Sequence, residues 1–142
     1  MTQWTGASRS NYVKCNAEKL ETLKQIFEFD TREKDGKIAI ISIAEGGETP
    51  YIDPDYDAEF LDILADMGAV LPEGADSIWL VDVIHLALEK CDDNVLVWIE
   101  AGCNGESYVG GYSVAIDPDG RELRKVNLAD IYAGTKWGAA EF

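Results

Sequence analysis

Residues 95 to 126 read VLVWIEAGCNGESYVGGYSVAIDPDGRELRKV, and this stretch decides the fold. Three segments rich in β-branched and aromatic residues, at 95–101, 107–116 and 122–126, are separated by clusters of glycine, asparagine and aspartate. Strands of this length with such breaks between them are typical of an antiparallel meander. The tetrapeptide DPDG at 117–120 has the residues of a tight turn, so it predicts the connection between the last two strands.

Upstream of the meander, the first 44 residues predict a strand, a helix and a hairpin. Alternation over 10–15 favours a short strand, and Asn16 then has the side chain of a helix N-cap. The helix after it has one apolar stripe, made of Leu20, Leu23, Ile26 and Phe27. The dipeptide Asp35-Gly36 is a strong turn signal, and the β-branched run at 37–44 follows it, so 30–44 is expected to be a hairpin.

The middle of the chain predicts a loop and two helices. Glycine, proline and aspartate dominate 45–56, which we expect to be irregular. The next helix ends at Gly68, and its apolar stripe consists of Phe60, Ile63, Leu64 and Met67. A third helix fits 76–90, with Trp79, Val83, Leu86 and Ala87 as its stripe. Residues 78–81 also fit a short strand before that helix, and Trp79 and Trp98 are read as core residues.

A last short helix is expected at 128–132, capped by Asn127 and ended by Gly134. The predicted order is then β, α, ββ, αα, βββ, α. This order indicates an α+β fold with an antiparallel sheet of about five to six strands and three to four helices, mainly on one face. The chain of 142 residues, of which 46% are hydrophobic, has the size and composition of one domain, so 1–142 is predicted to be a single α+β domain.

Three cysteines, Cys15, Cys91 and Cys103, are an odd number without CxxC spacing, which favours reduced thiols over a disulfide framework or a zinc site. Cys103 is expected in a turn at 102–105. No segment is apolar enough to cross a membrane and the first residues lack a signal-peptide pattern, so we expect a cytoplasmic protein.

The net charge of −15 is distributed unevenly along the chain. Residues 1–44 have a net charge of +1, residues 45–93 of −13, and residues 94–142 of −3. A field of this sign repels nucleic acids and anionic membranes, and it speeds the encounter with basic surfaces. The charge therefore indicates a basic protein as partner and argues against direct nucleic-acid binding and membrane binding.

The middle third contains the candidate partner-binding residues, which are all carboxylates on one loop, one helix and the turn after it. They are Asp53, Asp55, Asp57, Glu59, Asp62, Asp66, Glu73 and Asp76. In the helix, Glu59, Asp62 and Asp66 lie at positions i, i+3 and i+7, so they share a face with neighbours roughly 5 to 6 Å apart. Such a row can resemble the regular phosphates of DNA and occupy a basic groove. The alternative is a solvated helix face that keeps the protein soluble.

No set of catalytic or cofactor-binding residues is evident. The DxDxD pattern that begins at Asp53 is similar to the start of a calcium loop, but Ala58 and Leu64 stand where that loop needs glycine and glutamate. His85 is the single histidine, and no base is evident beside Cys103. No phosphate-binding or dinucleotide-binding glycine motif is present either. We therefore expect a protein that is not an enzyme and needs no cofactor or metal.

Four short motifs carry a family resemblance: WTG at 4–6, RSNY at 9–12, YVGGY at 108–112 and LxDIY at 128–132. With them the chain resembles a family of small acidic proteins encoded on phages and plasmids. The resemblance implies an α+β fold and a mobile-element setting, without catalytic residues. Mobile elements often carry acidic proteins that block host defence, so the hypothesis is an anti-CRISPR or anti-restriction inhibitor that acts as a DNA mimic. The alternative is a non-enzymatic adaptor or assembly domain whose acidic surface serves solubility only.

Overall fold

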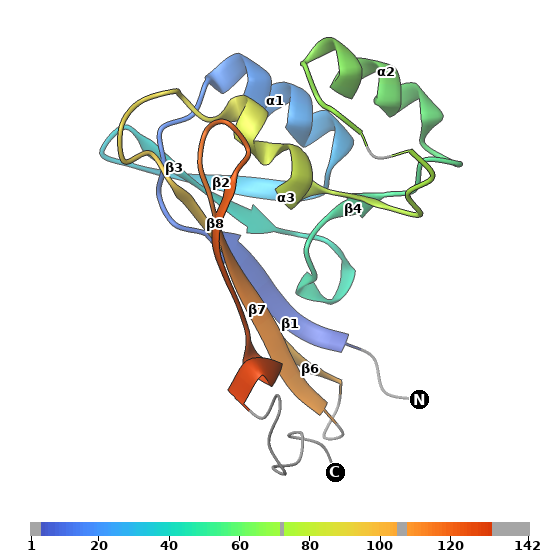
Figure 1. Cartoon of the computed structure of the whole chain (residues 1–142), viewed down its shortest axis with the longest axis vertical. Coiled ribbons are helices and arrows are strands. Elements are labelled where there is room, and N and C mark those ends of the chain that lie inside the picture. The colour runs from blue at the N-terminus through green and yellow to red at the C-terminus, as the bar shows by residue number, and fades with distance from the viewer. Residues whose placement is uncertain (1–3, 72, 105–107, 132–142) are drawn as a thin grey trace.

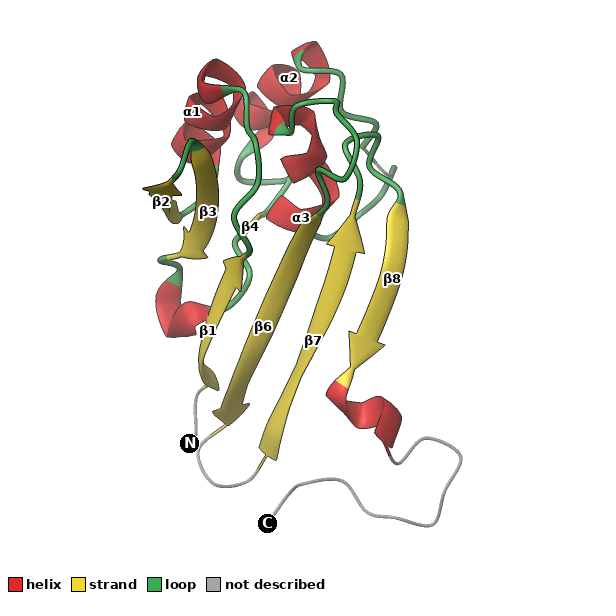
Figure 2. Ribbon diagram, turned by 90° about the vertical axis from the view of Figure 1, so that its left-hand side faces the viewer, coloured by secondary structure: helices red, strands yellow, loops and turns green. Residues whose placement is uncertain are grey.

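Six strands form the main sheet of the computed structural model, which describes residues 4–71, 73–104 and 108–131. They are β1 (Trp4–Ser10), β2 (Phe29–Lys34), β3 (Lys37–Ser42), β6 (Leu96–Asn104), β7 (Tyr108–Ile116) and β8 (Glu122–Asn127). Their order is β2-β3-β1-β6-β7-β8, and every neighbouring pair is antiparallel. Figure 2 shows β6, β7 and β8 side by side, with β8 at the edge of the sheet.

A second sheet has two short antiparallel strands, β4 (Tyr51–Ile52) and β5 (Ile78–Trp79). The helices are α1 (Ala17–Ile26), α2 (Ala58–Asp66) and α3 (Leu80–Val83), with 3-10 turns η1 (Glu45–Gly47), η2 (Ile84–Ala87) and η3 (Leu128–Ile131). Figure 1 shows α1, α2 and α3 together at one end of the molecule, while β1, β6 and β7 extend away from them. The predicted α+β class with an antiparallel sheet is confirmed.

The predicted meander is confirmed, with β6 pairing β7 and β7 pairing β8. Its second turn closes through hydrogen bonds from the Gly120 N–H to the Asp117 carbonyl and from the Asp117 N–H to the Arg121 carbonyl, both at 3.0 Å. The first connection differs from the prediction. Cys103 is paired within β6 and does not lie in a turn, because β6 and β7 continue their ladder to Asn104. The connection falls at 105–107, outside the described residues.

The first strand lies earlier in the chain than predicted. It spans Trp4–Ser10 and not 10–15, and it sits between β3 and β6. The ladder with β6 ends near Asn11, whose side chain accepts from the Val97 N–H at 2.8 Å and donates to the Val95 carbonyl at 3.0 Å. Within the predicted strand, Val13 and Cys15 form only isolated bridges. The position of this strand is therefore set by its distant partner rather than by local alternation.

Helix α1 and the β2–β3 hairpin follow the sequence signals. The Asn16 side chain accepts from the Lys19 N–H at 2.9 Å, which caps the helix. Both turn residues of the hairpin have positive φ, at 54° for Asp35 and 77° for Gly36, as a two-residue turn of this kind requires. The predicted apolar stripe of α1 is buried.

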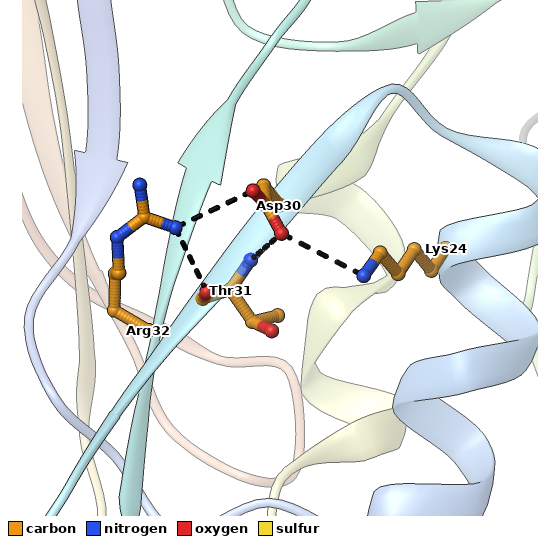
Figure 3. A network of polar contacts seen from close by, with 4 residues as sticks. All are labelled: Lys24, Asp30, Thr31 and Arg32. Carbon is orange, nitrogen blue, oxygen red and sulfur yellow. Dashed lines mark hydrogen bonds and ion pairs between the residues drawn. The ribbon is translucent and has the colours of Figure 1, made fainter.

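An exposed polar cluster joins α1 to β2 (Figure 3). The Asp30 carboxylate accepts from the Thr31 N–H at 2.8 Å and pairs with Arg32 at 3.3 Å and Lys24 at 3.6 Å. These contacts lower the pKa of the Asp30 carboxyl, the Thr31 N–H most, then Arg32 and Lys24. Because the charged side chains of Lys24, Asp30 and Arg32 are exposed to solvent, these ion pairs orient the side chains but contribute little to the stability of the fold.

The segment 76–90 is not one helix. Ile78 and Trp79 pair with β4, and α3 and η2 then make two short turns that end at Ala87. The strand that the sequence allowed before the helix is thus present, and Trp79 lies on it with 37% of its surface exposed rather than in the core. Trp79 lies in a strand and not in a helix because it pairs with Tyr51 of β4, and the helical spacing of the apolar residues gives no information about this distant partner. The expected loop at 45–56 also contains η1 and β4.

The core lies between the helices and one face of the sheet. Its largest fully buried side chains include Trp98, Phe29, Leu23, Ile40 and Leu64. Trp98 is thus a core residue, as predicted, whereas the opposite face of β6 leaves Ile99 49% exposed. Among the residues that the structure describes, none of the helices is long and apolar enough to span a membrane.

Candidate functional site

Six of the eight predicted partner-binding carboxylates form an exposed group on α2 and the segment around it. We call these the acidic surface: Asp55, Glu59, Asp62, Asp66, Glu73 and Asp76. Helix α2 lies with α1 and α3 at one end of the molecule (Figure 1). Leu64 anchors it with no exposed area, and Phe60 and Met67 pack against the core. Ile63, the fourth residue of the predicted buried stripe, is instead 38% exposed. The helix therefore presents its carboxylates to solvent from a fixed position.

Asp53 and Asp57 are half-buried and shape the loop instead. The Asp57 carboxylate accepts from the Asp53 N–H at 3.0 Å, and the Asp53 carboxylate accepts from the Asp55 N–H at 2.9 Å. These bonds turn the chain into α2 and use the DxDxD pattern for backbone geometry. In the described ranges, no group of three or more histidine, cysteine, aspartate or glutamate side chains is placed to hold a metal ion. Asp53 and Asp57 thus have a structural role in this loop.

No ion pair reaches the acidic surface from any residue that the structure describes. Within the described residues, the ion pairs are Lys24–Asp30, Arg32–Asp30 and Lys90–Asp119, so none includes a carboxylate of this surface. Each of its six side chains is exposed. Solvent and counterions therefore screen the repulsion within this group.

A second acidic region, which the sequence did not reveal, is a cleft of about 610 Å³ on the helix-facing side of β6, β7 and β8. We call it the cleft. Its charged and aromatic lining comes from four parts of the chain: Glu48, Trp79 with Asp82, Glu100 with Tyr112, and Glu122 with Lys125. Glu100 and Tyr112 are direct partners across β6 and β7. Four carboxylates thus surround one ammonium group.

Buried Thr49 holds one wall of the cleft in place. Its N–H and hydroxyl donate to the Glu100 carboxylate at 2.7 and 2.9 Å, and its hydroxyl oxygen accepts from the Trp98 indole N–H at 2.9 Å. The Tyr112 hydroxyl lies 2.9 Å from the same oxygen. Thr49 has no exposed area, so its bond from Trp98 is shielded from water, while the partly buried bonds to Glu100 and Tyr112 link the loop after η1 to the sheet.

The loop that carries Glu48 lies directly against β1. Ser8 donates from its hydroxyl to the Gly47 carbonyl at 2.7 Å, and Gly47 has a φ of 71°. A Cβ atom at Gly47 would lie 1.9 Å from the carbonyl oxygen of Gly6, so only glycine fits. Figure 2 shows η1 next to β1 at this place. The close approach fixes the position of Glu48 at the cleft.

The cleft alters the electrostatics of the groups that line it. Burial, then Glu100 and Glu45, raise the pKa of the Glu48 carboxyl. Burial also raises the pKa of the Tyr112 hydroxyl, with Thr49 acting in the opposite direction through its hydrogen bond. The Lys125 ammonium lies 5.6 Å from the centre of the Tyr112 ring, a cation–π distance. The cleft therefore disfavours additional negative charge.

The single histidine and the cysteines differ in burial and in the charges around them. Burial lowers the pKa of His85, against the opposing effect of Asp117 and Asp119, and its ring packs against Gly120. Burial and the nearby Glu89 raise the pKa of Cys15 to about 11, so this thiol is protonated at neutral pH. Cys91 is exposed and Cys103 is half-buried.

The sequence offers one signal for the cleft, which is the alternation of polar residues with core residues in β6. Trp98 and Glu100 are two positions apart, so they share a face, and a glutamate next to a core tryptophan needs a hydrogen-bond donor. No pattern names Thr49 as that donor, because it lies 51 positions away. Tyr132, the last residue of the LxDIY motif, and Gly134, the predicted end of the last helix, lie outside the described residues.

Comparisons with protein-family models, with curated proteins and with solved structures found no match to this chain.

Proposed function

We propose that this protein is a non-enzymatic inhibitor from a mobile element that binds a basic nucleic-acid-binding protein in the cytoplasm of its host. The acidic surface is the contact, and it takes the place of a DNA backbone as an anti-CRISPR or anti-restriction protein would. The observation that carries the proposal is that six carboxylates on and around α2 are exposed and have no cation partner among the described residues.

The geometry of α2 supports this function. Glu59, Asp62 and Asp66 follow one helical face and are separated by roughly the 5 to 6 Å that neighbouring positions allow. Lysine and arginine side chains that normally hold phosphates bind carboxylates with the same charge-assisted hydrogen bonds. A rigid row therefore gives a basic groove several contacts without the ordering cost of a flexible tail.

The test is a pull-down from host lysate at low and high salt, with identification of the captured proteins. We expect nucleic-acid-binding proteins at low salt, their release by duplex DNA, and a steep loss as the salt concentration rises. Asp62→Lys with Asp66→Lys should abolish capture. Glu21→Lys with Glu33→Lys changes the net charge equally on α1 and β2 and should leave capture nearly intact. Equal loss in both double variants would exclude a specific role for α2.

A second candidate function is an adaptor or assembly domain whose carboxylates serve solubility only. Every residue of the edge strand β8 is exposed, so its backbone is open to a further strand, and Ile99 and Val109 are about half exposed on the face away from the helices. An adaptor of this kind should bind its partner equally well at low and high salt, and Ile99→Lys rather than the α2 variants should abolish binding.

A further inference from the structure

The cleft has features that the proposed inhibitor function does not use. It is a cavity of about 610 Å³, within the range of roughly 300 to 1,000 Å³ that is usual for small-ligand sites. It lies on β6, β7 and β8, and its residues come from the 45–49 loop, β5, α3 and these three strands. None of the eight carboxylates predicted for partner binding lines it.

Aromatic rings form part of the cleft wall. Trp79 lines the cleft with 37% of its surface exposed, and its ring centroid lies 4.8 Å from that of Tyr51, which braces it from the side. Tyr112 lines the floor between Trp98 and Lys125 and is tied to Thr49. The faces of indole and phenol rings attract cations and also accept alkyl chains by apolar contact.

The charge of the cleft is unbalanced. Glu48, Asp82, Glu100 and Glu122 face a single cation, Lys125, whose ammonium already lies over Tyr112. The carboxylates of Glu48 and Glu122 form no hydrogen bond or ion pair with any described residue, so both are available. Burial raises the pKa of Glu48 most, and Glu100 and Glu45 add repulsion, which a second cation in the cleft would relieve.

We propose that the cleft binds an organic cation, an alkylammonium or guanidinium group whose alkyl chain lies on Trp79 and whose charge is balanced by the carboxylates of the cleft, Glu48 and Glu122 among them. The alkyl chain of such a ligand contacts the aromatic wall, and its positive charge offsets the excess negative charge of the carboxylates. Metal cations do not use the aromatic wall in this way, which is why the ligand is organic. A free polyamine and a lysine or arginine side chain of another protein both supply this chemistry.

The experiment follows the indole N–H signals of isotope-labelled protein by NMR while cadaverine is added. We expect a saturable shift of the Trp79 signal, assigned with Trp79→Phe, while the buried Trp98 signal stays unchanged because its N–H is bonded to Thr49. The diol with the same chain length should cause no shift. A Trp79 signal that does not respond to cadaverine at up to about 10 mM, well above a weak-site Kd of roughly 1 mM, would overturn the proposal.

Two matched double variants separate the cleft from general charge. Glu48→Gln with Glu122→Gln should weaken cadaverine binding about tenfold, whereas Asp62→Asn with Asp66→Asn removes the same charge from α2 and should change it by less than about twofold. Trp79→Leu should also weaken it by about tenfold. Equal weakening by both double variants would mean nonspecific attraction and would exclude the site.

Further ligands identify the source of the cation. Spermidine binding at least about tenfold more tightly than acetyl-lysine amide and acetyl-arginine amide would indicate a free polyamine, because its second and third charges reach further carboxylates. Similar or tighter binding of the amino-acid amides would indicate a partner side chain. The lysate capture of the α2 variants tests the inhibitor function separately, so either proposal can fail while the other stands.

Discussion

The acidic surface and the cleft are both rich in carboxylates, but they are built in opposite ways. The acidic surface comes from one continuous segment, 55–76, and its six side chains project into water without partners among the described residues. The cleft brings together residues from distant segments, and buried Thr49 positions Glu100 through two hydrogen bonds. The carboxylates of the acidic surface are numerous and solvated, whereas in the cleft Glu100 is held in a defined position by hydrogen bonds.

This difference determines what each region can recognise. An exposed charge is screened over roughly 8 to 10 Å at physiological salt, so the acidic surface depends on several contacts at once and tolerates inexact geometry. The cleft has a lower local dielectric and fixed walls, so single contacts count for more and the shape of the ligand matters. Substitutions should accordingly have larger effects on stability around the cleft than around α2.

The largest effect is expected at Gly47, which holds the cleft loop against β1. Gly47→Ala would place a Cβ 1.9 Å from the Gly6 carbonyl oxygen and force a side chain onto a positive φ. We expect a loss of about 3 to 5 kcal/mol in the free energy of unfolding, measured by urea denaturation.

Gly74, in the segment of the acidic surface, is the matched control. Its φ of 74° is close to that of Gly47, but nothing lies within 4 Å of an added Cβ. Gly74→Ala should therefore cost only the backbone strain, about 1 kcal/mol. Similar losses for the two variants would show that the loop moves to accommodate the clash.

The next effect is expected at Thr49. Thr49→Val keeps the shape but removes the hydroxyl, which leaves the Trp98 indole N–H without its acceptor and removes one donor to Glu100. The expected loss is about 2 to 3 kcal/mol by chemical denaturation. Thr22→Val on α1 breaks only a bond to the Glu18 carbonyl near solvent and should cost less than about 0.5 kcal/mol. A Thr49→Val loss as small as the control would disprove the role of this network.

Within the acidic segment, the predicted carboxylates should separate into structural and exposed residues. Asp57→Ala removes the acceptor for the Asp53 N–H before α2 and should cost about 1 kcal/mol in thermal or chemical unfolding. Asp55→Ala, in which the lost side chain is exposed and accepts no hydrogen bond from a described residue, should cost less than about 0.5 kcal/mol. A larger loss for Asp55→Ala than for Asp57→Ala would contradict the structural role of Asp57.

The smallest effect concerns pH. The raised pKa of Glu48 means that the folded state disfavours its charged form. The resulting loss of folding stability is absent at a pH below the ordinary pKa of 4.5, where the carboxyl is protonated in both the folded and the unfolded state. It is complete at a pH above the raised pKa of the folded state. Glu48→Gln should therefore stabilise the protein at pH 7 by a few tenths of a kcal/mol, since Glu48 is partly solvated, and should have no effect near pH 3. Destabilisation at pH 7 would contradict the repulsion between Glu48 and Glu100.

Elements with short-range signals could be predicted from the sequence. Asn16 and Lys19, three positions apart, cap α1, and Asp35-Gly36 and 117–120 form the expected turns. In each case the residues that determine the structure are neighbours in the chain. The exposed carboxylates of α2 belong to the same class, because helical spacing is enough to place them on one face.

Elements that depend on distant partners could not be predicted. Residues 10–15 alternate better than 4–10, yet β1 is 4–10, since β6 supplies its hydrogen bonds. Trp79 fits a helical stripe but is held in a strand by Tyr51. The cleft could not be predicted for the same reason, because Thr49 and Glu100 come into contact only when the loop packs against the sheet.

The central position of β1 also has a consequence for the time course of folding. Ser10 pairs with Trp98 and Trp4 with Asn104, so β1 has no β6 partner during synthesis until about a hundred further residues have followed it. Contacts of such long range place refolding in the range of roughly milliseconds to seconds, which stopped-flow fluorescence can measure. During synthesis β1 therefore has only β3 as a strand partner until β6 follows, and a chain released before β6 would expose the other edge of β1, which chaperones can recognise.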